Sequence, residues 1–224
     1  MKVLLQALAT VPIGLVVFGL LVFGSAGTFD YWQGWAFIAV FALATLIPSI
    51  YLGLRNPEAL RRRMHAGPGA ETRTLQKVSS VVAFGSLAAM IVVSALDFRF
   101  GWSSVPAAVS VAGDVLVAIG LGMSMLVVIQ NSYAAANITV EAEQQLVTSG
   151  LYGFVRHPMY FGNVIMMIGI PLALGSYWGL VLVLPGLIVL GLRIADEEDM
   201  LKQQLGGYRE YMQQVHFRLV PYVW

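Results

Sequence analysis

Two short polar segments in the second half of the chain carry the residues whose types and spacing could support chemistry. The first contains Arg156-His157-Pro158, with Tyr160 close behind. The second contains Arg193 and Glu197, whose i, i+4 spacing places them on one face of a helix. An arginine could align an anionic substrate with its donor fork. A histidine or a glutamate could accept a proton, and a glutamate could also bind hydroxyl groups.

Each of these residues also has a purely structural interpretation. Arg193 and Glu197 could form an ion pair at a helix end. The four consecutive acids at positions 196–199 could be a solvated helix face. His157 could begin a helix at Pro158 with its ring already hydrogen-bonded, because proline suits the first turn of a helix.

The apolar sequence between the two polar segments favours a functional site. Residues 158–174 and 177–192 are both apolar, and only Gly175-Ser176 separates them. Each stretch is near the short limit of the roughly 20 residues that a membrane span needs. Together they predict a tight helical hairpin that brings both polar segments to the same membrane face. Ionisable groups gathered near membrane depth predict a functional site.

The composition requires a membrane around the elements that position these residues. The chain is 58% hydrophobic and 11% charged, whereas soluble domains carry about 25% charged residues. Ahead of the hairpin, four segments are apolar and long enough to cross a bilayer, at roughly 4–25, 34–54, 78–96 and 105–129. The sequence thus predicts an all-α, polytopic membrane protein with four transmembrane helices, a C-terminal helical hairpin and interfacial cytoplasmic segments.

The distribution of basic residues predicts the orientation. If every span crosses once, all of the thirteen lysines and arginines except Arg99 fall on one face. A cluster of them lies between the second and third spans: Arg55, Arg61, Arg62, Arg63, Arg73 and Lys77. By the positive-inside rule this face is cytoplasmic, and so are both termini and the site.

We predict one integral membrane domain over residues 1–224, with spans in 1–129 and the chemistry in 130–224. Alternation of polar and apolar residues over 137–143 predicts a short extended or interfacial segment. The net charge of +1 gives no argument for nucleic acid. With no cysteine, and with His65 and His216 lacking a second ligand at metal spacing, we expect no metal site. Membrane lipids are expected partners, and the oligomeric state is left open.

Several motifs in the second half occur in a characteristic order: Leu146-Val147-Thr148-Ser149-Gly150-Leu151-Tyr152, Val155 to Gly162, Arg193 to Glu198, Leu205 to Tyr211 and Val220-Pro221. In this order they resemble the isoprenylcysteine carboxyl methyltransferase family, a broad group of membrane methyltransferases that includes phospholipid N-methyltransferase relatives. The resemblance covers roughly residues 130–224.

The resemblance implies an enzyme that uses S-adenosylmethionine on a lipophilic or membrane-resident acceptor. That acceptor would be the carboxylate of a prenylcysteine-like substrate, or a small thiol or amine. The implied cofactor contacts are Gln144, Gln145, Leu146, Val147, Tyr152, His157, Pro158, Met159, Tyr160 and Glu197. Arg193 would face the substrate and the transferring methyl group, and Arg193 with Glu197 would form the catalytic pair.

Two other functions remain open. Some sterol reductases share a similar C-terminal framework and use NADPH, and Arg156 and Arg193 are the basic residues that could bind its phosphate. A non-enzymatic membrane protein such as a small transporter would require paired charges within the spans, and only Asp114 is available there. No Gly-x-Gly-x-x-Gly follows a strand pattern, so a soluble dinucleotide-binding domain is not predicted.

Overall fold

The computed structural model describes residues 2–64, 69, 71, 73–134 and 144–224, and the regular structure in these ranges is helical. The helices on the N-terminal side are α1 (Lys2–Gly19), continued by the π-helical turn η1 (Leu20–Gly24), α2 (Trp32–Arg55), α3 (Pro57–Met64), α4 (Thr74–Phe100) and α5 (Ala107–Gln130). Those that follow are η3 (Gly150–Gly153), α6 (Pro158–Ala173), η4 (Trp178–Leu182), α7 (Val183–Gln204) and α8 (Tyr208–Gln214). The predicted segment 137–143 lies outside the described residues.

Within the described residues, five helices are long and apolar enough to cross a membrane: Lys2–Gly24, Trp32–Arg55, Thr74–Phe100, Ala107–Gln130 and Trp178–Gln204. The chain is therefore an all-α, polytopic membrane protein, as predicted. The second arm of the hairpin is longer than expected, because α7 continues past Leu192 and through the acidic run. The helix ends at Gln204, and Gly207 adopts a φ of 80° before α8.

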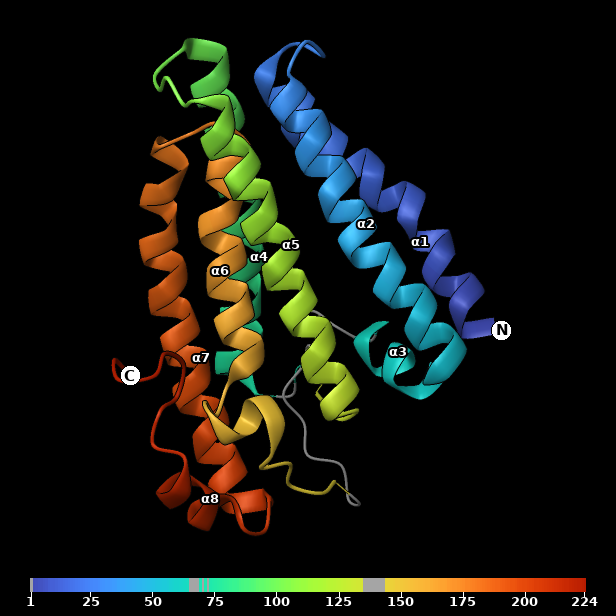
Figure 1. Ribbon diagram of the computed structural model, residues 1–224, viewed down its shortest axis with the longest axis vertical. Helices are drawn as coiled ribbons and strands as arrows, with labels where there is room; N and C mark the ends of the chain where they lie inside the picture. The colour runs from blue at the N-terminus through green and yellow to red at the C-terminus, as the bar shows by residue number, and fades with distance from the viewer. Residues whose placement is uncertain (1, 65–68, 70, 72, 135–143) are drawn as a thin grey trace.

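The hairpin of α6 and α7 runs alongside α4 and α5 for most of the bundle (Figure 1). Its turn is tied to the connection between α4 and α5. The Ser176 hydroxyl donates to Asp97 Oδ2 at 2.6 Å, and the Tyr177 amide donates to Ser103 Oγ at 3.2 Å. Asp97 also accepts from the Ser103 amide at 2.6 Å. The hairpin therefore reaches the far end of the bundle, opposite the predicted site.

Close packing of α5 against α6 sets the position of the residues that begin α6. A Cβ atom added at Gly120 would lie 2.5 Å from the Gly162 carbonyl oxygen, and one added at Gly169 would lie 2.8 Å from the Gly113 carbonyl oxygen. Small residues allow two membrane helices to approach this closely. Gly120 therefore lies in the contact between α5 and α6, whereas Gly122 has nothing within 4 Å of an added Cβ.

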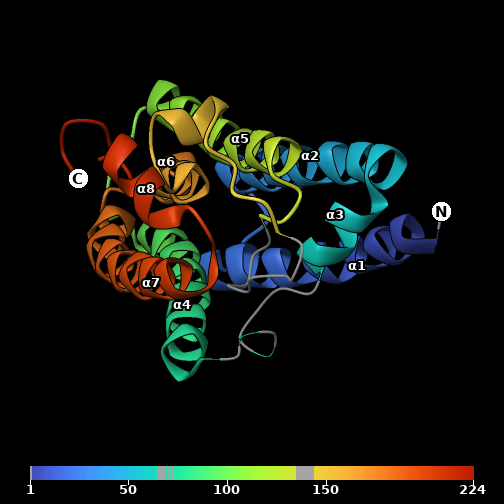
Figure 2. The ribbon, with the colours of Figure 1, turned by 90° about the horizontal axis from the view of Figure 1, so that it is seen from below.

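The pair α1 and α2 leans away from the other helices at the end of the bundle that carries α3 (Figures 1 and 2). At the opposite end the two groups are joined. The Tyr31 ring stacks on Phe98 with centroids 4.0 Å apart, and its hydroxyl donates to the Leu174 carbonyl oxygen at 2.5 Å. The α3 helix packs its buried Ala59 and Leu60 in a small core that also contains Leu52 and Val128.

Candidate active site

A cavity of about 350 Å³ lies where α6 begins and α7 continues into its polar half. Its wall is built mainly from α4, α6 and α7, from the segment that starts at Gln144, and from α8, and it also includes Arg63 of α3. Every residue predicted for the site lines it: Gln144, Gln145, Leu146, Val147, Tyr152, His157, Pro158, Met159, Tyr160, Arg193 and Glu197. The structure thus brings these residues together, while their roles toward a cofactor stay predictions.

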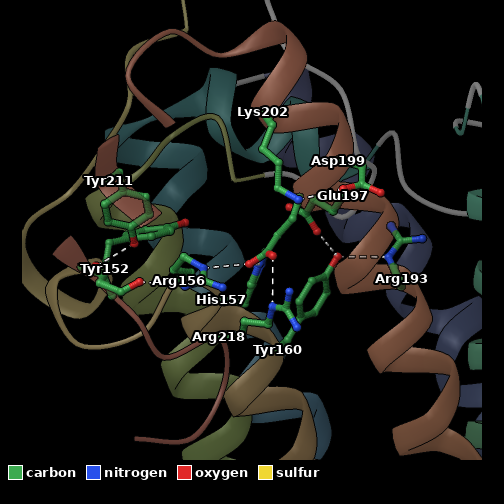
Figure 3. Close-up of polar contacts among 12 residues, drawn as sticks. Tyr152, Arg156, His157, Tyr160, Arg193, Glu197, Asp199, Lys202, Tyr211 and Arg218 are labelled. Atoms are coloured by element: carbon green, nitrogen blue, oxygen red, sulfur yellow. Dashed lines mark hydrogen bonds and ion pairs between the residues drawn. The ribbon is translucent and has the colours of Figure 1, made fainter. Parts of the chain in front are cut away.

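The Tyr160 hydroxyl bridges the two residues predicted as the catalytic pair (Figure 3). It donates to Glu197 Oε2 at 2.7 Å and accepts from Arg193 Nε at 3.1 Å. A phenol from α6 therefore links the i, i+4 pair on α7. Among the described residues, Glu197 Oε1 has no hydrogen-bond partner, so this carboxylate retains an acceptor for a ligand on a side chain that lines the cavity.

The Arg193 guanidinium is held by residues that lie before and within α4. Its Nη2 is 2.6 Å from Glu71 Oε1, and its Nη1 donates to Ser80 Oγ at 2.8 Å. Both members of the Arg193–Glu71 ion pair are buried. All three guanidinium nitrogens thus donate to protein groups. The predicted contact of Arg193 with a substrate stays a prediction, and the geometry gives this residue a positioning role toward Tyr160.

The four consecutive acids at positions 196–199 do not form one solvated face. Successive residues of an α-helix are rotated by about 100°, so the four side chains point in different directions. Asp196 is buried and pairs with Arg73, with an N–O distance of 2.6 Å, and also with Gln76. Glu197 lines the cavity, Glu198 is fully buried, and Asp199 is exposed and pairs with Lys202 at 2.8 Å.

Glu198 joins the start of α6 to the C-terminal segment, a role that the sequence analysis missed. Its carboxylate lies 2.7 Å from Arg156 Nε, 3.3 Å from His157 Nε2 and 3.0 Å from Arg218 Nε. The Arg156 amide donates to the Phe217 carbonyl oxygen at 2.9 Å, and the His157 amide donates to the Arg218 carbonyl oxygen at 2.9 Å. We call this set of contacts between Glu198, the start of α6 and the C-terminal segment the C-terminal clasp. The Arg156 side chain is part of it and is therefore poorly suited to bind a free phosphate.

The helix start predicted at His157 and Pro158 is confirmed: His157 is the residue before the first turn of α6, and Pro158 begins that turn. The imidazole is buried and stacks on the Tyr160 ring with centroids 5.6 Å apart. His157 therefore begins the helix with its ring already in contact with Glu198, as its structural interpretation predicted, and the residue also lines the cavity.

Tyr152 and α8 close the polar end of the cavity. The Tyr152 hydroxyl accepts from Asn131 Nδ2 at 3.3 Å, and its carbonyl oxygen accepts from the Tyr211 hydroxyl at 2.7 Å. Burial raises the pKa of Tyr152 to about 12, so the phenol is neutral at physiological pH. Tyr152 can therefore act there as a hydrogen-bonding group and not as a base. Leu146 and Tyr152 both pack against a small apolar core that includes Tyr208 and Tyr211.

The cavity has an apolar arm between α4, α6 and α7. The residues that line this arm are Phe84, Leu87 and Met90 from α4, Met166 and Met167 from α6, and Gly186, Val189 and Leu190 from α7. These positions belong to segments long enough to cross a membrane or to the apolar helix between them. A single cavity therefore joins a polar end, rich in hydrogen-bonding groups, to a surface that suits a hydrocarbon chain.

The described residues contain no group of three histidine, aspartate and glutamate side chains placed to hold a metal ion.

Comparisons with known proteins find similarity in the part of the chain that contains α6 and α7, two of the helices that line the cavity. Residues 109–207 match the family model described as phospholipid methyltransferase. The chain is also 36% identical over 84 residues to Delta(14)-sterol reductase TM7SF2 from Mus musculus, an alignment that covers 36% of this chain. The chain spans 20% of the length of that curated relative. The C-terminal region is thus similar to a domain that membrane methyltransferases share with sterol reductases.

Proposed function

We propose that the protein is an S-adenosylmethionine-dependent methyltransferase that acts on a lipophilic acceptor within the membrane. The observation that carries the proposal is the form of the cavity. Glu197 and Tyr160 line a polar end, and an apolar arm between α4, α6 and α7 is continuous with it. The similarity of residues 109–207 to phospholipid methyltransferase supports the same reaction class.

The residues present fit this cofactor. Glu197 offers Oε1 as an acceptor to ribose hydroxyls, as acidic side chains do in other nucleoside sites. Tyr160 holds the other oxygen of that carboxylate, and Arg193 in turn fixes the Tyr160 hydroxyl. The cavity volume of about 350 Å³ lies within the range of small-molecule and cofactor sites.

The chemistry requires positioning more than acid–base catalysis. The cofactor supplies a methyl group that is already activated by its sulfonium. The chain must bind the acceptor in line with that group and exclude water. The apolar arm would hold the hydrocarbon part of the acceptor and keep water out. A carboxylate or thiolate acceptor needs no strong base, which agrees with the commitment of His157 to Glu198.

A second candidate is an NADPH-dependent reductase, and the similarity to a sterol reductase favours it. NADPH carries a 2′-phosphate, which needs an available cation in the site. The guanidinium groups of Arg156 and Arg193, the two arginines next to the predicted cofactor contacts, are both paired with carboxylates of the protein. The third arginine in the cavity wall, Arg63, lies on α3, away from Tyr160 and Glu197 in the sequence and on a different helix. We therefore rank the reductase below the methyltransferase.

Calorimetry on the purified full chain would distinguish the two functions. We expect S-adenosylmethionine and S-adenosylhomocysteine to bind, and NADPH to give no heat. The variant Glu197→Gln should weaken binding of both methionine cofactors at least tenfold, because a charge-assisted hydrogen bond is worth about 1.5–3 kcal/mol. Asp199→Asn is the matched control on an exposed acid two residues away. Binding of NADPH alone would replace the methyltransferase by the reductase.

We also infer that the site faces the cytoplasm. Support comes from α3, whose three consecutive arginines lie at the end of the bundle that carries the cavity, and from the positive-inside rule. Because the chain has no cysteine, single-cysteine labelling in intact cells can test the orientation. Arg209→Cys should be protected from an impermeant maleimide and Ser104→Cys should react. The reverse pattern would invert the orientation.

A further inference from the structure

The short helix α3 holds Arg63 in a fixed place beside the membrane helices. Its first turn is capped by Asn56, whose Oδ1 accepts from the Ala59 amide at 3.1 Å. Ala59 and Leu60 are buried against residues of α2 and α5. The helix is therefore anchored on its apolar side, and the arginines that follow cannot move freely relative to the bundle.

The three consecutive arginines of α3 have different surroundings. Arg61 forms a bidentate contact with Glu58, and Arg62 lies 3.7 Å from the same carboxylate and 4.6 Å from the centre of the Tyr133 ring. Arg63 differs from both: its Nη1 is buried and has no hydrogen-bond partner among the described residues. Burial also lowers the pKa of Arg63, so its environment disfavours the charged form.

Arg63 lies in the wall between two cavities. One is the candidate site, and the other is a cavity of about 380 Å³ between α1, α2, α3 and α5. The second cavity lies where α1 and α2 lean away from α5 (Figures 1 and 2). Its lining is mainly apolar and includes Leu8, Leu15, Phe18, Phe41, Leu52 and Leu121.

A cation whose Nη1 is buried without a partner in the wall of an apolar cavity has a definite chemical complement. A buried charged group without a partner is costly, and an anion that accepts a charge-assisted hydrogen bond from it offsets that cost. The apolar lining favours a hydrocarbon chain, and the volume is at the low end of the roughly 300–1,000 Å³ seen for ligand sites. The cavity therefore suits one chain better than the two chains of a phospholipid.

We propose that Arg63 binds the carboxylate head group of a single-chain, fatty-acid-like amphiphile whose hydrocarbon chain lies in the cavity between α1, α2 and α5. The Nη1 group that the protein leaves unpaired would donate to the carboxylate. This site is separate from the proposed cofactor contacts, so it does not depend on the methyltransferase assignment.

Equilibrium binding of radiolabelled palmitate to the full chain in phosphatidylcholine nanodiscs tests the proposal. We expect saturable binding at one site per chain. Methyl palmitate, with the same chain and no charge, should compete at least tenfold more weakly. Arg63→Gln should weaken palmitate binding about tenfold or more, in keeping with the loss of a charge-assisted hydrogen bond. Arg63→Lys should restore part of the affinity, and Arg61→Gln should bind as the parent does.

A second variant tests the cavity without touching the arginine. Gly14 lines the cavity, and nothing lies within 4 Å of a Cβ added there, so Gly14→Phe can fill part of the space while the fold is retained. We expect it to reduce palmitate affinity at least tenfold, with thermal unfolding unchanged.

Four results would overturn the proposal. Equal binding of palmitate and methyl palmitate would show that no anion is recognised. Unchanged binding in both Arg63→Gln and Gly14→Phe would place the amphiphile elsewhere. Full displacement by inorganic phosphate or by S-adenosylmethionine would assign Arg63 to an anion of the site cavity. Displacement by phosphatidylglycerol at equal concentration would identify a two-chain lipid as the occupant.

Discussion

Arg193 and Glu71 are 122 residues apart in the chain and form a buried ion pair, with 2.6 Å between Nη2 and Oε1. The pair fixes the polar half of α7 against the segment that leads into α4. It also determines where Arg193 presents its Nε to Tyr160, and through Tyr160 it sets the position of Glu197. A contact with a residue outside the predicted cofactor contacts therefore controls the geometry of the predicted catalytic pair.

Removing one member of this pair should destabilise the protein. Arg193→Ala would leave the Glu71 carboxylate buried without its partner, at a cost of about 3–5 kcal/mol. The double variant Arg193→Met with Glu71→Gln should be less destabilised than the sum of the single variants predicts. Thermal unfolding in detergent, followed by circular dichroism, checks both results. Additive effects would mean that the pair contributes no coupling energy.

Tyr160→Phe should impair cofactor binding and leave the fold intact. The ring would keep its stacking on His157, while Glu197 and Arg193 would lose the hydroxyl that bridges them. We expect an affinity for S-adenosylmethionine about tenfold lower, as for the loss of a hydrogen bond to a charged group. Tyr177→Phe, on an exposed tyrosine at the hairpin turn, is the control. Equal affinities for S-adenosylmethionine in the two variants would show that the Tyr160 hydroxyl does not contribute to cofactor binding.

Glu198→Gln should loosen the C-terminal segment. Glu198 is buried and pairs with both Arg156 and Arg218, so the variant leaves the buried Arg156 guanidinium without a carboxylate partner. We expect a loss of roughly 3 kcal/mol and faster hydrogen exchange at the amides of Arg156 and His157. The adjacent Asp199→Asn affects only an exposed pair and should change stability by no more than about 0.5 kcal/mol. Equal stability and equal hydrogen exchange in the two variants would mean that Glu198 does not hold the C-terminal segment against α6.

Gly120→Ala and Gly122→Ala should have opposite effects although they lie two residues apart on α5. The methyl group at position 120 would meet the Gly162 carbonyl oxygen, and overpacking of this kind costs about 1–3 kcal/mol. At position 122 the space is open, and alanine favours a helix by up to about 1 kcal/mol over glycine. Unfolding midpoints of the two variants give the comparison. A stable Gly120→Ala variant would show that α5 and α6 can separate.

The membrane helices were predictable because hydropathy and length are local properties of the chain. The hairpin followed from two apolar stretches on either side of Gly175-Ser176. The contact of the hairpin turn with the end of α4 could not be predicted, because the hydrogen bond from Ser176 to Asp97 links residues 79 apart in the chain. The second arm of the hairpin was predicted to end near Leu192, since a buried polar helix and an exposed polar segment have similar composition.

The gathering of the site residues was predictable from the hairpin and from the order of the motifs. The partners of those residues were not. Glu71 and Ser80 lie before and within a predicted span, and nothing local indicates that they contact Arg193. Glu198 stood in a run of four acids, and only the rotation of α7 against its neighbours distinguishes it from Glu197. Arg63 likewise stood in a basic cluster whose distribution was sufficiently explained by topology.

The four acids of α7 make this helix intolerant of insertions. Each side chain serves a different neighbour: α4 at Asp196, the cavity at Glu197, the C-terminal clasp at Glu198 and the outer surface at Asp199. One residue added upstream in α7 would turn the whole set by about 100°. Asp196, Glu197 and Glu198 would each move to the place of the acid that follows it, and Asp199 would move to the buried place of Met200. A single codon would thus disconnect three regions of the molecule at once.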